Sequence, residues 1–346
     1  MRPRSKRPGR HYRNNTRRAA WAAAIFSAVV AAGCSSGQNS PATTGSSAES
    51  PSASARPESA PFTIVAQYSA KSLDLLRPAH LAIGPDGNLY IPDARQRINV
   101  ISPQGKVLRR WGSPGKGPGQ FRFVRQNTSP DVIGETAIVA VAADGHVYVT
   151  DSGNARVQVF TAEGRFLRQF GRYGSGRSEW LFPTGVVVDH DGGIYVEDDK
   201  GEVLRRFSSS GTPEWQIRAS ETTDDDLAGH LHLAGVDSHN RLVAVDDDKA
   251  TVVYLDRRGH KVDAFGAADL GCDVTIDSAG NVYVTSCQEP LDSPHTLKIF
   301  DRTHQLIASW DPAPMGWSPR FGPKGEIFTL GEDGSVLQLA MNLPVR

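Results

Sequence analysis

The stretch "DGNLYIPDARQRINVISPQGKVLRRWG", residues 86–112, decides the fold, because the chain repeats it as "DGHVYVTDSGNARVQVFTAEGRFLRQFG", residues 144–171. In both copies a DG turn leads into an alternating apolar segment that ends in Asp. A second apolar segment, a second Gly turn and a third segment follow. Alternating segments joined by turns that permit positive φ are typical of β-hairpins. The phrase therefore predicts an antiparallel sheet that the chain builds more than once.

The repeat extends along most of the chain. Its turns centre on six residues, with spacings of 58, 47, 48, 40 and 45 residues: Gly87, Gly145, Gly192, Asn240, Gly280 and Gly325. Six copies of roughly 47 residues match the period of four-stranded propeller blades. A short apolar run such as "GVVVD", residues 185–189, supplies the first strand of a copy. The sequence predicts an all-β chain, a six-bladed β-propeller with four-stranded antiparallel blades over residues 62–346.

The sequence pattern of the copies resembles that of the NHL-repeat family of six-bladed β-propellers. The match is best over residues 77–121, which have the Pro, the DG turn, the Asp that ends the second strand, a following basic residue and a Gly-rich exit. Copy six offers only three strands, and "FTIVAQY", residues 62–68, has no partner in copy one. We expect these two segments to pair, because closure of the ring removes an exposed sheet edge.

The N-terminal region has the pattern of an export signal. Residues 1–33 hold eight basic side chains, no acidic one, and the 14-residue apolar run "AAWAAAIFSAVVAA". That run is shorter than the ~20 residues that span a bilayer, and its flanks suit a signal peptide. The stretch "AAGC", residues 31–34, resembles a bacterial lipobox, which implies a Cys34 that is lipidated, for instance with palmitate. An ordinary secretory signal is the alternative, and Arg17-Arg18 leaves Sec and twin-arginine export both open.

The rest of the composition supports an extracytoplasmic protein anchored to the bacterial cell membrane through Cys34. Residues 34–61 contain the lipidated Cys and then a flexible linker, since they have almost no apolar content. Without residues 1–33 the chain has 30 basic and 38 acidic side chains. An acidic body argues against a nucleic-acid partner. We expect a monomer.

Two more cysteines favour an oxidising compartment. Cys272 opens the first strand of copy five, and Cys287 follows its second strand. Pairing of Ile276 with Val282 across the turn would place residue 272 opposite about residue 286. We therefore expect a disulfide, which would contribute about 3 kcal/mol on the loop-entropy model. Free thiols are the alternative.

The carboxylates that end the second strands form a recurring set: Asp93, Asp151, Asp198 and Asp246. A basic residue follows each of them: Arg97, Arg156, Lys200 and Lys249. Because the pairs recur in register, we interpret them as structural staples of the loop between strands two and three.

Residues that depart from the repeat at the mouth of the central channel are the candidate ligand site. His80 aligns with Gly185, Asp273 has the same register, His232 lies one place earlier, and Arg320 lies just inside. The long segments 125–136, 218–230 and 288–295 belong to the same face, and repeat proteins often have insertions on the binding face. Incidental lining residues are the alternative.

The function that these features favour is a ligand- or protein-binding scaffold or sensor at the cell envelope. Its partner would be an envelope protein or a small polar ligand, with no cofactor, no bound metal and no assigned catalytic residue. The alternative is a metal-dependent lyase or lactonase, since two His and one Asp can bind a metal. The NHL family includes a zinc-dependent amidating lyase with channel histidines, but only two histidines align here. A purely structural envelope protein is a third possibility.

Overall fold

The structure is a computed structural model that describes residues 62–78, 80–123, 137–198, 202–218, 227, 231–246, 249–267, 271–286, 296–310, 319–331 and 333–342. The predicted signal peptide, Cys34, the linker and Cys287 lie outside these residues. Within them, no helix has the length and the hydropathy that crossing a membrane requires.

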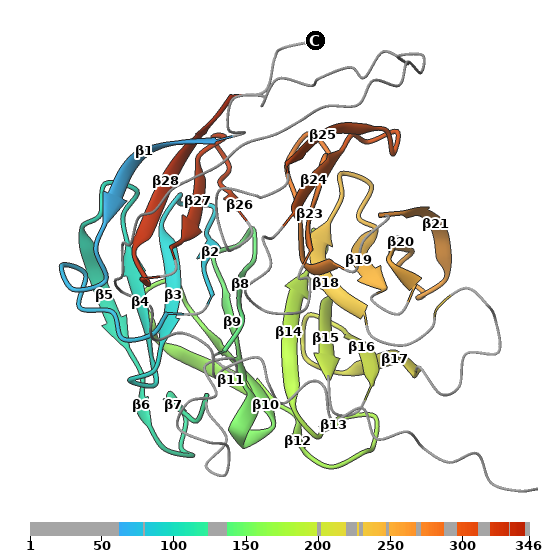
Figure 1. The fold of residues 1–346 in the computed structure, drawn as a ribbon. Helices are drawn as coiled ribbons and strands as arrows, with labels where there is room; N and C mark the ends of the chain where they lie inside the picture. Colours follow the sequence, from blue (N-terminus) through green and yellow to red (C-terminus); the bar gives the residue numbers. More distant parts are fainter. Residues whose placement is uncertain are drawn as a thin grey trace, which may run out of the picture.

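The chain forms six four-stranded antiparallel sheets around a central axis (Figure 1). Blade 1 consists of β2 (Ala82–Ile83), β3 (Leu89–Asp93), β4 (Arg97–Ile101) and β5 (Val107–Trp111). Blade 2 consists of β8 (Val139–Val141), β9 (Val147–Asp151), β10 (Arg156–Phe160) and β11 (Phe166–Phe170). Blade 3 consists of β14 (Pro183–Val188), β15 (Ile194–Asp198), β16 (Val203–Phe207) and β17 (Pro213–Arg218).

The second half of the ring has the same order. Blade 4 consists of β18 (Leu231–Val236), β19 (Leu242–Asp246), β20 (Thr251–Leu255) and β21 (Lys261–Gly266). Blade 5 consists of β22 (Gly271–Ile276), β23 (Val282–Ser286), β24 (Thr296–Phe300) and β25 (Leu306–Trp310). Blade 6 consists of β26 (Arg320–Phe321), β27 (Ile327–Leu330), β28 (Val336–Met341) and, from the start of the described chain, β1 (Phe62–Tyr68). The prediction of an all-β six-bladed propeller is confirmed.

Ring closure occurs where the sequence predicts it. β1 pairs antiparallel with β28, from Phe62 opposite Met341 to Tyr68 opposite Val336. The two strands lie side by side in Figure 1 although they come from opposite ends of the described chain. This pairing joins the last blade to the first, so the sixth sheet has its full set of four strands.

Blades 1 and 2 are each followed by a short Gly-rich loop, closed by a pair of two-residue strands, that the later blades do not show in the described residues. β6 (Ser113–Pro114) pairs in parallel with β7 (Gln120–Phe121). β12 (Arg172–Tyr173) pairs in the same way with β13 (Glu179–Trp180). A single turn of 3-10 helix, η2 (Ser152–Asn154), lies between β9 and β10.

The turns between first and second strands have the predicted conformation. Their central residues have positive φ, for example 83° at Gly145 and 60° at Asn240. Asn is among the few side chains that tolerate this region, which explains how blade 4 keeps the turn without a glycine.

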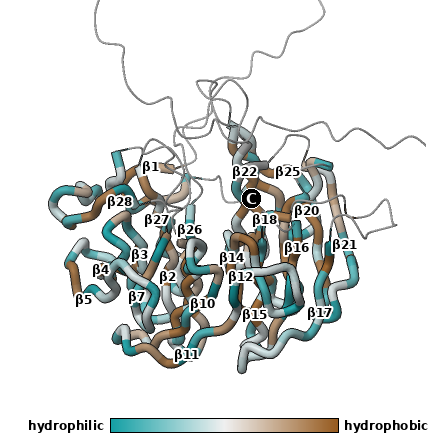
Figure 2. The backbone as a smooth tube through the Cα atoms, turned by 90° about the horizontal axis from the view of Figure 1, so that it is seen from below, coloured by the Kyte–Doolittle hydropathy of each residue, from teal (hydrophilic) through white to brown (hydrophobic). Residues whose placement is uncertain are grey.

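The core lies between the blades. The buried apolar residues of the described chain form six clusters, and each cluster joins two neighbouring sheets. Figure 2 shows apolar residues along the strands and polar residues at many of the turns. Because a single blade leaves both of its faces apolar, the blades are stable only as a closed ring.

A second repeated contact links neighbouring blades, and the sequence analysis did not find it. The turn between the third and fourth strands of a blade packs on an aromatic ring from the fourth strand of the preceding blade. The pairs are Tyr68 with Gly105, Trp111 with Gly164, Phe170 with Gly211, Trp215 with Gly259 and Phe265 with His304. His304 has φ of 67°. Blade 5 therefore has a histidine at the positive-φ position that is a glycine in the other four turns.

In blade 5 one part of the predicted strand register is wrong. Ile276 lies opposite Val282 as predicted, but a bulge shifts the rest of the ladder, so Gly271 lies opposite Ser286 and Asp273 opposite Thr285. Residue 272 therefore falls in the bulge and is not paired with residue 286. The predicted disulfide with Cys287 lies outside the described residues.

Candidate functional site

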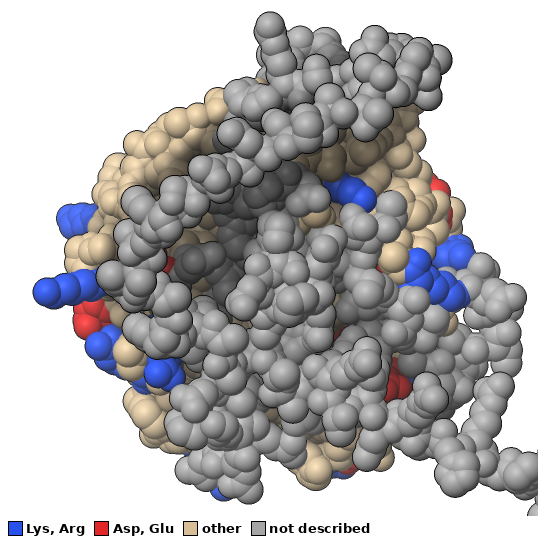
Figure 3. All heavy atoms as spheres, in the orientation of Figure 1, with Lys and Arg blue, Asp and Glu red and all other residues tan. Residues whose placement is uncertain are grey.

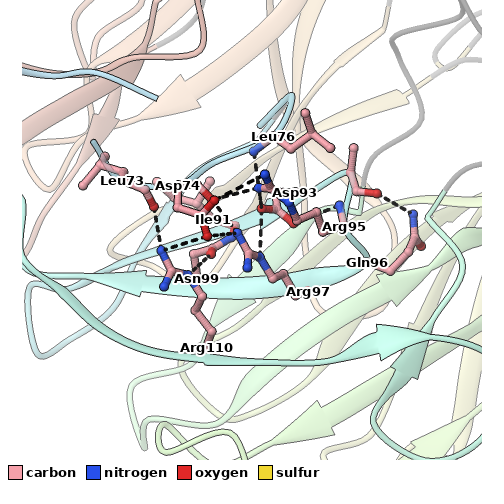
Figure 4. A network of polar contacts seen from close by, with 11 residues as sticks. Leu73, Asp74, Leu76, Ile91, Asp93, Arg95, Gln96, Arg97, Asn99 and Arg110 are labelled. Carbon is pink, nitrogen blue, oxygen red and sulfur yellow. Dashed lines mark hydrogen bonds and ion pairs between the residues drawn. The ribbon is translucent and has the colours of Figure 1, made fainter. Parts of the chain in front are cut away.

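The carboxylate that ends the second strand of blade 1 is a structural group, as its contacts in Figure 4 show. The Asp93 side chain is fully buried. It accepts hydrogen bonds from Arg97 Nε at 3.0 Å, Arg95 N at 3.0 Å and Leu76 N at 3.4 Å. These donors come from the third strand, from the loop before it and from the segment that leads into the blade. Asp93 therefore holds three parts of the chain together, which agrees with its interpretation as a staple.

Blades 2 and 3 have the same arrangement, a buried Asp that contacts an Arg side chain and a backbone N–H. Asp151 accepts from Arg156 Nε and from the backbone N of Arg122, both at 2.7 Å. Asp198 accepts from the backbone N of Phe182 at 2.8 Å and contacts Arg205 Nη1 at 3.4 Å.

The basic partners in blades 3 and 4 differ from the prediction. Lys200 lies outside the described residues, and Arg205, two places further along the third strand than the position of Arg156, reaches the Asp of blade 3. In blade 4, Lys249 Nζ is buried without a hydrogen-bond partner in the described chain. The Asp246–Lys249 pair is therefore not formed, because sequence order after the Asp does not determine which side chain reaches it.

The four predicted ligand residues lie at the same end of the ring axis. They belong to the beginnings of first strands: His80 precedes β2, Arg320 starts β26, and His232 and Asp273 are the second and third residues of β18 and β22. Asp273 and Arg320 form an ion pair of 3.1 Å between Oδ2 and Nη2, with side chains 35% and 22% exposed. The pair joins blade 5 to blade 6 and leaves both charges in reach of solvent.

His80 links blade 1 to blade 2 at this end. Its Nδ1 accepts a hydrogen bond from the backbone N of Val139 at 3.4 Å. Burial, and then the positive charge of Arg320, hold the pKa of the His80 imidazole well below its usual value. His80 is therefore neutral, and since Nδ1 is the acceptor, Nε2 bears the proton.

His232 contacts a residue that the sequence analysis missed. Its Nδ1 lies 3.4 Å from Glu197 Oε1, and the two come from blades 4 and 3. A bulge between Leu233 and Gly235 places His232 opposite Val245. His232 thus pairs with the fourth residue of its second strand, as Asp273 and Gly185 do, and does not lie one place earlier. The sequence did contain a signal for Glu197. It is charged, whereas the fourth residue of the other aligned second strands is uncharged: Pro92, Thr150, Val245 and Thr285.

The candidate site is therefore two groups of polar side chains. Asp273, Arg320 and His80 belong to one group, and Glu197 and His232 to the other. Within the described ranges, no cluster of three or more His, Cys, Asp or Glu side chains could hold a metal ion. The described side chains thus present hydrogen-bond donors, acceptors and charges of both signs.

The comparisons with known proteins agree with this architecture. A family model described as a 6-bladed beta-propeller matches residues 120–283. Protein brain tumor of Drosophila melanogaster is 24% identical over 188 residues, 49% of this chain and 15% of that protein. The E3 ubiquitin-protein ligase NHLRC1 of Rattus norvegicus is 23% identical over 236 residues, 62% of this chain and 55% of that protein. This chain is a six-bladed β-propeller that resembles NHL-repeat proteins.

The chain spans only part of these relatives, from about a seventh to about half of their length. Among solved structures, streptogramin B lyase superposes with a TM-score of 0.56 at 11% identity, over 81% of this chain and 98% of that one. Raptor of Chaetomium thermophilum gives a TM-score of 0.51 at 12% identity, over 78% of this chain and 24% of that one. At such identities the likeness shows the fold and no shared activity.

Proposed function

We propose that this protein is an exported, lipid-anchored propeller that binds a small polar ligand or an envelope protein at the end of the axis where the first strands begin. The observation that carries the proposal is the set of polar side chains that five blades bring to this end: His80, Glu197, His232, Asp273 and Arg320. Ligand sites of ring-shaped folds combine polar groups from distant segments in this way.

The relatives agree with a binding module. NHL propellers occur in proteins as different as brain tumor and NHLRC1, which is what a reusable binding module would do. The Cys34 anchor and the linker of residues 35–61 would tether such a module to the outer side of the cell membrane.

The binding proposal is tested by screening a set of small polar compounds by ligand-observed NMR against the protein and its Asp273→Asn/Arg320→Gln variant. Asn has the size of Asp, and Gln is a shorter polar side chain than Arg; since both positions are partly exposed, the fold should persist. We expect at least one compound whose binding the double change weakens. The Asp301→Asn change, in a turn of blade 5, is the matched control and should have no effect on binding. Equal binding by all three proteins would refute this location of the site.

The anchor is tested by cell fractionation of the Cys34→Ser variant. We expect the wild-type protein in the membrane fraction and the variant in the soluble extracytoplasmic fraction. Unchanged membrane retention of the variant would contradict lipid anchoring through Cys34.

A metal-assisted lyase or lactonase is the second candidate, favoured by the two histidines at this end of the axis. Elemental analysis of protein purified without added metal distinguishes the candidates. About one transition metal per chain that is lost on His80→Ala/His232→Ala would support the enzyme. Metal-free protein that still binds a polar compound would support the binding module.

A further inference from the structure

Glu197 is unusual for its place in the fold. It is the fourth residue of β15, where the strand faces the next blade, and its side chain is only 13% exposed. An ionised carboxylate loses hydration at such a position, and the loss is costly unless partners replace it. The other blades avoid this cost with apolar or hydroxyl residues.

The surroundings of Glu197 leave one of its two carboxylate oxygens without a hydrogen bond in the described chain. Oε1 accepts from Thr184 Oγ1 at 3.3 Å and lies 3.4 Å from His232 Nδ1. Oε2 lies over Gly185, where an added Cβ would come within 2.7 Å of it. The glycine thus leaves space for this oxygen, and no hydrogen bond to Oε2 occurs in the described chain. Both contacts of Oε1 are long for charge-assisted bonds.

The charge of the neighbouring half of the ring favours a cation at this place. Residues 219–346, which include blades 4 and 5, contain 20 acidic and 10 basic side chains. Such an excess creates a negative potential that attracts cations to the surface. The set of one carboxylate, one hydroxyl and one imidazole suits the N–H donors of an organic ammonium or guanidinium group.

We propose that Glu197, supported by Thr184 and His232, binds the ammonium or guanidinium group of the ligand. This inference rests on the proposed binding function and names the ligand class: a compound with at least one organic cationic group. The cation donates to Oε2, and Thr184 holds the carboxylate in place through Oε1. Asp273 and Arg320 belong to the other group of side chains and do not take part in this contact.

The inference is tested with benzylammonium chloride and its neutral analogue benzyl alcohol, by saturation-transfer NMR on the whole protein. We expect saturable binding of benzylammonium to the wild type and about tenfold or greater weakening by Glu197→Gln, because a charged hydrogen bond is lost. The Thr184→Val change, which removes only the orienting hydroxyl, should weaken binding by a smaller factor. Benzyl alcohol should bind both proteins equally weakly.

Glu163→Gln, in an exposed turn of blade 2, is the matched control and should leave benzylammonium binding unchanged. Thermal unfolding of each variant identifies loss of fold separately from loss of binding. Equal affinity of wild type and Glu197→Gln for benzylammonium, or no binding to the wild type, would overturn the inference. Either result would leave the binding proposal to be judged by its own Asp273→Asn/Arg320→Gln screen.

Discussion

The first three blades and the last three share one architecture but differ in how their ends are fastened. In blades 1 to 3 a buried Asp joins a third-strand Arg to a backbone N–H of the segment leading into the blade. At the corresponding Asp positions blades 5 and 6 have Ser286 and Leu330. Blades 5 and 6 fold into the same sheet without this Asp, so the staple is an addition to a fold that apolar packing specifies.

The two halves also differ in charge. Residues 62–218 contain 19 basic and 16 acidic side chains, against 10 and 20 in residues 219–346. Figure 3 shows Lys and Arg side chains on the left-hand rim, over β4 and β5 of blade 1, and others on the right-hand side of the molecule. The first half therefore uses arginines for internal fastening and surface charge, and the second half has an acidic excess beside the proposed cation site.

The largest expected effect comes from breaking a staple. Arg156 is 7% exposed on its side chain and donates to Asp151, to Gln169 and to the carbonyls of Lys116, Gly117 and Gln120. Its replacement, Arg156→Met, leaves a buried carboxylate without its ion-pair partner and should cost about 3–5 kcal/mol of unfolding free energy. Chemical denaturation measures this cost.

The matched change in the second half is Thr251→Val, because Thr251 lies opposite Asp246 as Arg156 lies opposite Asp151. It removes the hydrogen bond that Thr251 Oγ1 donates to the carbonyl of Lys249 at 3.0 Å, and should therefore cost about 1 kcal/mol. Similar losses of unfolding free energy for the two variants would contradict a difference in stability between the two kinds of fastening.

A smaller effect is expected at the turns that pack on aromatic rings. Gly164 has φ of 89°, and an added Cβ would lie 2.6 Å from the Trp111 ring. Gly164→Ala should therefore cost about 2 kcal/mol or more, because backbone strain adds to displacement of the indole. Thermal unfolding tests this value.

His304→Gly is the reciprocal change in blade 5. It relieves about 1 kcal/mol of backbone strain but removes the stack on Phe265, whose ring centroid is 4.5 Å away. Since a ring stack contributes about as much, the net change should stay within about 1 kcal/mol. A loss as large as that of Gly164→Ala would mean that the imidazole is essential to blade 5.

The smallest effect concerns pH. The pKa of His80 is lowered on folding, so the unfolded chain takes up a proton before the folded chain does as the pH falls. The His80 contribution is therefore complete above the ordinary pKa of 6.5 and declines as the pH falls below it. His80→Gln should reduce the loss of stability between about pH 6.5 and pH 5. Denaturation at these two pH values measures it, and an unchanged pH dependence would contradict the burial of a neutral imidazole.

Much of the fold could be predicted because its signals are local. The turn residues, the alternating second strands and the unpartnered segment Phe62–Tyr68 are patterns that short stretches of sequence contain. The contact of His304 with Phe265 was not predictable in this way, because the two residues belong to different blades and meet only when the ring is packed.

The candidate site could be predicted only in part. His80, Asp273 and Arg320 were found as departures from the repeat, and they lie at one end of the axis. Glu197 departs from the repeat just as clearly. It belongs to a second strand, whereas the predicted residues align with the beginnings of first strands. Its meeting with His232 depends on the bulge in β18, which counting from the turn does not reveal.

The sequence by itself determined the blade, the number of blades and the closure of the ring, because strand period and turn chemistry are encoded within a few neighbouring residues. Only the tertiary structure decided which polar side chains meet between blades: Asp273 with Arg320, His80 with Val139, and Glu197 with His232. Those contacts depend on bulges and on the packing of neighbouring sheets, which bring together residues from different repeats.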